Sequence, residues 1–303
     1  MAPEGRRKAP PVAERLADIE GRISSVRQLS AVVTAMRGIA AARTHEANAR
    51  LDGIRAYART IGAAIAQALA LQPEDGEPFA HRGQDCPPRH LIVAVASEQG
   101  FVGGYNSHVL DAAVRYGAGQ GDGRADLFLI GDRGAMTAAE RDLTVACSLP
   151  MAGHVDQVAS LANRLADALF DRLERGLADR VTLLHAVPGG GIGTEIAEKT
   201  LIPFDYARFP PVSRAQPPLL TLPPAALLTR LADEYMFAEL CEALTLGYAA
   251  ENEARMRAMV AARDNVGRTL DELTGRARQL RQDQITEEVV ELATATVSGS
   301  DPA

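Results

Sequence analysis

The chain has 303 residues, of which 47% are hydrophobic and 23% are charged, so it can bury one or two ordinary cores and is neither fibrous nor broadly disordered. Its net charge of −7 argues against a surface built as a whole to hold nucleic acid. The three cysteines are far apart and form no C-x-x-C pair, which argues against a disulfide framework or a zinc cluster. The strongly apolar stretch 91–96 is far short of the ~20 residues that cross a bilayer.

Residues 12–71 are predicted to form one long helix. The segment contains no proline, and its apolar residues recur mainly at steps of three and four, at Leu16, Ile19, Ile23, Val26, Val33 and Met36. This pattern indicates one narrow buried stripe, and four glycines make so long a helix depend on a partner. Residues 1–11 have charges without an apolar stretch behind them, so they are predicted to be a flexible tail and not a signal peptide.

A different pattern fills residues 90–210, which lie between two predicted proline-rich linkers at 72–89 and 211–224. Short β-type runs alternate here with helical stretches. The runs are at 91–96, 127–130 and 181–185, and the helical stretches are at about 102–116 and 154–177. This alternation predicts an α/β domain with a parallel sheet.

A second long helix is predicted over residues 225–297, followed by a tail at 298–303. Its heptad stripe runs through Met256, Met259, Arg263, Val266, Leu270, Leu273, Ala277 and Leu280, and then shifts to Ile285, Val289 and Leu292. A helix of about 70 residues is on the order of 100 Å long, which a globular domain cannot enclose. The predicted fold is therefore an α/β domain inserted between two long terminal helices that form an antiparallel coiled coil.

Arginines dominate parts of both predicted helices. Arg22, Arg27, Arg37 and Arg43 occur with no acid among them, and seven arginines between residues 255 and 281 face only three acids. Such a face can simply be solvated and paired along its own helix. Because opposite charges at the (i, i+4) spacing are mostly missing and the rest of the chain is acidic, we favour an acidic partner around the helices.

Four segments resemble the gamma subunit of rotary ATP synthases, the central-stalk rotor, in that family's order. They are 34–43 (TAMRGIAAAR), 97–106 (SEQGFVGGYN), 253–259 (EARMRAM) with Asp264 and Asn265, and 285–288 (ITEE) with Arg281 and Gln282 before it. The resemblance covers nearly the whole chain. It departs from the family's common form at Phe101 and Val102, and at Arg37 and Arg43, where lysines are usual.

The resemblance implies an asymmetric shaft that couples ion flow to ATP synthesis or hydrolysis elsewhere and is not itself catalytic. The implied partners are a ring of alpha and beta subunits, the epsilon subunit and the membrane c-ring, with no nucleic acid and no direct membrane insertion. The chain would sit peripherally at the cytoplasmic face of a bacterial inner membrane. The implied partner contacts are Met36, Arg37, Arg43, Arg255, Arg257, Gln282 and Thr286.

The subtype and the coupling ion stay open in the sequence. Segments 27–30 (RQLS) and 36–39 (MRGI) look like the divergent, sodium-type alternative ATP synthases, whereas the complex could also be driven by protons. For Met36, packing in the coiled-coil seam and contact with the beta subunit are both open.

The rival interpretation is an α/β protein that binds a nucleotide or small substrate and uses its coiled coil as a scaffold. Glycine-rich segments at 189–193 and 100–104 invite it, but neither has the spacing of a phosphate loop or a dinucleotide turn. The six histidines show no paired metal-ligand spacing. The sequence therefore predicts no cofactor, no metal and no catalytic residue.

Overall fold

The computed structural model describes residues 12–71, 89–119, 125–189, 194–212 and 219–298. Two long helices, α1 (Val12–Leu69) and α5 (Pro224–Ser298), begin and end this part of the chain. The described residues form two compact units, one from 39–258 and one that joins those before 39 to those after 258. Outside the described residues lie the predicted N-terminal tail, the predicted C-terminal tail after residue 298, residues 72–88 of the first predicted linker and residues 213–218 of the second. No described helix is long and apolar enough to span a membrane.

The unit of residues 39–258 contains a five-stranded sheet in the order β3-β2-β1-β4-β5. The strands are β1 (His90–Val95), β2 (Ala125–Ile130), β3 (Val145–Leu149), β4 (Arg180–Val187) and β5 (Glu195–Ile202). β1 to β4 are parallel, but β5 pairs with β4 in the antiparallel direction. The three β-type runs of the sequence are β1, β2 and β4, and they are parallel as predicted. The edge strands β3 and β5 were missed, and β5 is antiparallel to the rest. Both alternate between exposed and less exposed positions, so neither forms a continuous apolar run.

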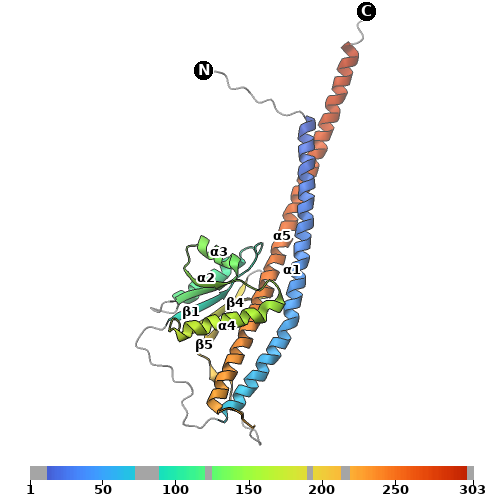
Figure 1. The fold of residues 1–303 in the computed structure, drawn as a ribbon. Coiled ribbons are helices and arrows are strands. Elements are labelled where there is room, and N and C mark those ends of the chain that lie inside the picture. The colour runs from blue at the N-terminus through green and yellow to red at the C-terminus, as the bar shows by residue number, and fades with distance from the viewer. Residues whose placement is uncertain (1–11, 72–88, 120–124, 190–193, 213–218, 299–303) are drawn as a thin grey trace, which may run out of the picture. The chain divides into compact units, whose positions relative to one another are not determined.

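Helices cover both faces of this sheet (Figure 1). The helices are α2 (Tyr105–Ala118), α3 (Asp132–Glu140) and α4 (Val158–Glu174), and α3 was missed in the sequence. Because side chains alternate along a strand, Leu91, Val93 and Val95 face α4 and part of α5, whereas Ile92 and Ala94 face α2 and α3. The domain is thus a three-layer α/β fold, and α5 supplies part of one layer.

α5 passes very close to the end of β1. A Cβ atom added at Gly247 would lie 2.5 Å from a methyl carbon of Val95, so only glycine fits there. The next turns of α5 place Ala250 and Ala254 in the core cluster on the other face of the sheet. α5 therefore crosses the edge at which β1 ends, and this crossing positions the site described below.

α1 pairs with α5 in the unit of residues 39–258. Arg55 Nε lies 2.8 Å from Glu242, and the Tyr57 hydroxyl donates to Glu234 at 2.6 Å. Since the partner's number falls as the α1 number rises, the two helices are antiparallel, which confirms the predicted pairing. An apolar cluster that includes Ile65, Phe209 and Leu228 packs between the end of α1 and the beginning of α5.

The other unit is the same helix pair without a covering sheet. Ile19, Ile23, Leu273 and Ala277 form its buried cluster, and Glu20 accepts from Arg281 at 2.7 Å. Leu270 and Leu280 are partly buried beside the cluster, as the stripe predicts. A correction concerns Arg263, which is exposed while Ala262 beside it is half-buried, so position 263 does not lie in the seam.

Candidate functional site

The loop after β1 is held by side-chain hydrogen bonds to several other segments of the α/β domain. The side-chain amide of Asn106 is paired twice with Ser97, accepting from its backbone N–H at 3.0 Å and donating to its hydroxyl at 2.9 Å. The Glu98 carboxylate accepts from the backbone N–H groups of Asp132 at 3.1 Å and Met151 at 2.7 Å. The segment 97–106 thus ties together the loops that follow β1, β2 and β3.

α5 closes this loop with a buried ion pair, Glu251–Arg255, whose oxygen and nitrogen are 2.6 Å apart. Glu251 accepts from the backbone N–H groups of Glu98 and Gln99, both at 3.2 Å. Arg255 donates to the carbonyls of Gln99 at 3.3 Å and Gly100 at 3.2 Å, and to the Asn252 side chain at 2.9 Å. We call Glu251, Arg255 and residues 98–100 the α5 clamp, because they join the helix to the sheet.

The clamp is dry. Glu251 and Arg255 are 3% and 4% exposed, so both charges depend on each other and on the backbone of the loop. Burial raises the pKa of the Glu251 carboxyl, while Arg255 and the two loop N–H groups oppose that rise. Burial also raises the pKa of the Tyr105 hydroxyl beside the clamp, which keeps it neutral. The charges at this site are internal to the domain.

The clamp occupies the position at which many open α/β sheets bind a phosphate. The strand order reverses between β1 and β4, and ligands of such sheets lie at the carboxyl ends of the strands there. Here the loop amides of Glu98 and Gln99 receive a carboxylate of the chain itself. The predicted strand-to-helix turn at 100–104 is present, with Phe101 and Gly103 at φ of 61° and 58°.

The second glycine segment, 189–193, lies mostly outside the described residues. Gly189 is described, and its N–H donates to Glu253 at 2.8 Å. Glu253 also pairs with Arg257 at 2.7 Å. The first glycine of this segment therefore faces an acidic side chain, which disfavours an anion there.

Two arginines of the sequence-based contact set have partners along their own helix. Arg255 and Arg257 pair with Glu251 and Glu253 at the (i, i+4) spacing, so the expectation that such partners are mostly missing was wrong for both. Arg257 keeps 39% of its side chain exposed, whereas the guanidinium of Arg255 is enclosed. Arg255 is therefore available to the clamp and not to another protein in this conformation.

The other residues of that set lie on open helix surface. Met36, Arg37 and Arg43 are half-buried on α1, and Gln282 and Thr286 are exposed on α5. The Thr286 hydroxyl donates to the Gln282 carbonyl at 2.9 Å.

The structure does not bring all of these residues together. Arg281, adjacent to Gln282, pairs with Glu20. That contact places Gln282 roughly 24 Å along α1 from Met36, at 1.5 Å per residue. In the unit of residues 39–258, Arg43 and Arg255 both lower the pKa of Tyr248, which burial raises above its ordinary value.

Residues at the centre of the clamp were missed in the sequence. Glu251 and Glu98 accept hydrogen bonds from backbone N–H groups and Asn252 accepts from Arg255, yet none of these three residues was assigned a role from the sequence. The one available signal was the (i, i+4) spacing of Glu251 and Arg255 on a predicted helix. No group of three or more metal-ligating side chains occurs among the described residues.

A model of the ATP synthase family described as "ATP synthase" matches residues 15–298 of the chain. Among curated relatives, the "ATP synthase gamma chain" of Frankia casuarinae is 29% identical over 95% of this chain and 100% of its own length. That of Halothermothrix orenii is 26% identical over 92% and 97%.

Solved structures agree with the fold. A chain of the Euglena gracilis mitochondrial ATP synthase, solved as OSCP/F1/c-ring, has a TM-score of 0.62 at 14% identity, covering 96% of this chain and 97% of that chain. A chain of the Tetrahymena thermophila mitochondrial ATP synthase central stalk and c-ring has a TM-score of 0.53 at 18% identity, covering 76% and 99%. With the family model matching nearly every described residue and the relatives aligned end to end, the chain belongs to the ATP synthase gamma-chain family.

Proposed function

We propose that this chain is the central-stalk rotor subunit of a rotary ATP synthase, coupling ion flow through the membrane sector to ATP synthesis or hydrolysis. The observation that carries the proposal is the antiparallel pairing of α1 and α5, with an α/β domain inserted between these two helices in the chain order. Such a pair has no three-fold symmetry, so it presses differently on the subunits of a surrounding ring at every angle. The clamp supports this role because it joins the sheet to the helix that would carry torque.

The subunit is proposed to be non-catalytic. The strand-end position that could hold a phosphate is filled by Glu251, which supports this assignment over the nucleotide-binding alternative. The purified chain is expected to hydrolyse no ATP. ATP turnover that persists through repurification and disappears when the chain's own residues are mutated would favour the rival interpretation, in which the chain is an enzyme.

The proposed partners are a ring of alpha and beta subunits, the epsilon subunit and the membrane c-ring. The proposed location is the cytoplasmic face of a bacterial inner membrane, where the chain binds peripherally. Arg37, Arg43 and Arg257 on the helix surface, with Met36, would contact acidic segments of the ring, and Gln282 and Thr286 would contact it further along α5. Surface ion pairs of this kind are worth about 1 kcal/mol or less each, so they would tune coupling more than assembly.

A paired substitution tests the arginine contacts. Arg37→Gln with Arg43→Gln removes two charges for which the described residues offer no ion-pair partner and keeps helix propensity nearly unchanged. Membranes carrying the double variant should keep assembly and most ATP hydrolysis, while ion pumping per ATP falls. Arg175→Gln, which breaks an exposed pair with Asp171 on α4, is the control and should pump normally. Unchanged pumping per ATP in the double variant at low salt, where such pairs are strongest, would refute the contacts.

The coupling ion is tested on the assembled complex. The sodium-type subtype, which we propose from segments 27–30 and 36–39, requires ATP-driven uptake of sodium into reconstituted vesicles that a protonophore does not abolish. Uptake of protons alone would assign the complex to the proton-driven group. Either result leaves the rotor proposal itself in place.

A further inference from the structure

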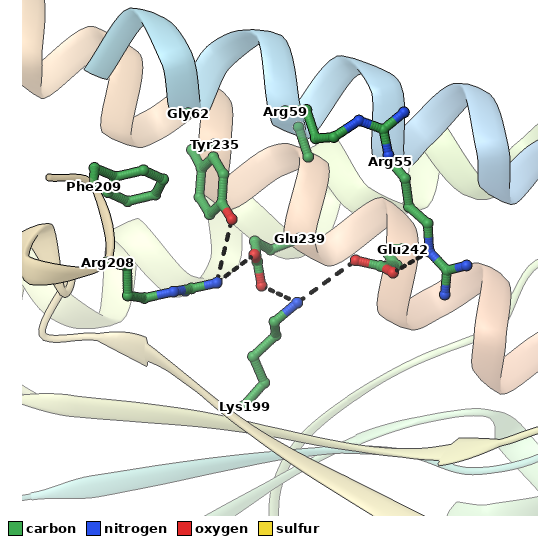
Figure 2. Close-up of a pocket in the computed structure, with 10 residues that line it drawn as sticks. Arg55, Arg59, Gly62, Lys199, Arg208, Phe209, Tyr235, Glu239 and Glu242 are labelled. Atoms are coloured by element: carbon green, nitrogen blue, oxygen red, sulfur yellow. Dashed lines mark hydrogen bonds and ion pairs between the residues drawn. The ribbon is translucent and has the colours of Figure 1, made fainter. Parts of the chain in front are cut away.

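An open pocket of about 500 Å³ lies between α1, α5, β5 and the short helical turn at Tyr206–Arg208 (Figure 2). It is separate from the α5 clamp and from the arginine surface of the proposed function. Its charged lining comes from Arg55, Arg59, Lys199, Arg208, Glu239 and Glu242. Four cations and two carboxylates leave an excess of two positive charges on a chain whose net charge is −7.

The two carboxylates order the cations without neutralising them. Glu239 is buried, at 5% exposed, and is held by Lys199 and by Arg208, whose nitrogen is 3.2 Å away. Glu242 accepts from Arg55 Nε at 2.8 Å and lies 3.6 Å from Lys199. Figure 2 shows Lys199 extending from β5 to both carboxylates.

Donor groups are left over after these contacts. Arg55 uses only its Nε in the hydrogen bonds among described residues, so both terminal nitrogens remain available. Arg59 lines the same pocket, and no described side chain pairs with it. The surplus therefore consists of guanidinium N–H groups at an open surface.

Arg208 is held rigidly by its neighbours. Its guanidinium carbon lies 5.9 Å from the ring centre of Phe209 and 5.5 Å from that of Tyr235, and it donates to the Tyr235 hydroxyl at 3.2 Å. Burial and the neighbouring Glu239 raise the pKa of Tyr235 to about 12, so this hydroxyl stays protonated. A guanidinium already fixed in place loses little side-chain entropy when it binds an anion.

We infer that this pocket binds a phosphate-bearing anion. Guanidinium groups match phosphate oxygens with paired hydrogen bonds, and a doubly charged anion balances the excess charge. The concave shape and volume suit a small phosphorylated group better than an extended acidic peptide. The phosphate could come from a soluble compound or from a lipid headgroup, and the experiment separates these sources.

The test is isothermal calorimetry of the full chain with inorganic pyrophosphate at low salt. Arg59→Gln removes a guanidinium group that no described side chain pairs with. Arg208→Lys keeps the positive charge but removes the planar guanidinium and its contacts with the two aromatic rings. Each should weaken binding about tenfold, as expected for losing a charge-assisted hydrogen bond in a partly solvated site. Arg50→Gln is the control, because Arg50 lies on the same helix outside the pocket and pairs with Asp156. Melting followed by circular dichroism checks that every variant is folded.

Two further probes identify the source. ADP reports a soluble phosphate compound, and sedimentation with phosphatidylglycerol vesicles against phosphatidylcholine vesicles reports a lipid headgroup; loss of either signal in Arg59→Gln supports the pocket. No binding of any probe at millimolar concentration, or binding that Arg59→Gln and Arg208→Lys leave unchanged, would overturn the inference. A polyglutamate peptide that binds more tightly than pyrophosphate and requires Arg59 would also overturn it, in favour of an acidic protein. Because the chain is tested alone, failure here leaves the rotor proposal untouched.

Discussion

Replacing Arg255 with methionine tests the α5 clamp directly. Arg255 is 4% exposed and donates to four oxygen atoms, so its removal leaves the Glu251 carboxylate buried without its cation. Breaking a buried pair from one side costs about 3 to 5 kcal/mol. Arg257→Met is the matched control two residues along the helix, because its pair with Glu253 is partly exposed and worth about 1 kcal/mol or less.

The pH dependence follows from the buried carboxylate. Burial already raises the pKa of Glu251 and Arg255 lowers it, so removing Arg255 raises the folded-state pKa further above the ordinary value of 4.5. A group with a raised folded pKa contributes stability that is present below its unfolded pKa and is lost as pH rises through the folded pKa. The free energy of unfolding that Arg255→Met loses relative to the parent chain should therefore be smaller at about pH 5 than at about pH 8.

Urea unfolding of the full chain, followed by circular dichroism at both pH values, gives the free energies of unfolding. Arg255→Met should fall several kcal/mol below the parent at the higher pH, whereas Arg257→Met stays close to it. If the two variants unfold alike, or if the deficit of Arg255→Met is the same at both pH values, the ion pair does not hold α5 to the sheet as argued.

The remaining predictions concern the helix pair, the contact of α5 with the sheet, and the pocket. Leu273→Ala should cost about 2 to 5 kcal/mol because Leu273 is buried in the seam, whereas exposed Ile285→Ala should stay within about 0.5 kcal/mol in urea unfolding; equal losses would contradict the seam. Gly247→Ala should destabilise by about 1 to 3 kcal/mol through overpacking, while Gly267→Ala, which meets open space, should raise the melting temperature through about 1 kcal/mol of helix propensity. Burial opposes ionisation of Glu242, but Arg55 and Lys199 outweigh it and hold the pKa below its ordinary value. Its stabilisation should therefore be lost as pH falls through the lowered value, so Glu242→Gln should flatten the acid limb of stability against pH, and an unchanged limb would refute this.

The helix pair was predictable because its information is local. A repeat of three and four apolar steps describes one buried stripe along a helix, and two such helices without a globular cover must bury their stripes on each other. Ile19, Ile23, Leu273 and Ala277 do so in the structure. The same local reasoning misplaced Arg263, because a one-residue shift of the stripe to Ala262 leaves most other seam positions unchanged.

The sequence by itself therefore determined the long helices, the inserted α/β domain and the family, all of which depend on periodicity and on contiguous motifs. Only the tertiary structure decided the clamp and the cationic pocket, because each joins residues far apart in the chain. Glu251 meets Gln99 across 152 positions, and Arg55 meets Glu242 across 187. A charged residue on a helix looks the same in sequence whether it faces water or a buried partner, and packing alone decides whether its charge is solvated, paired or free to bind.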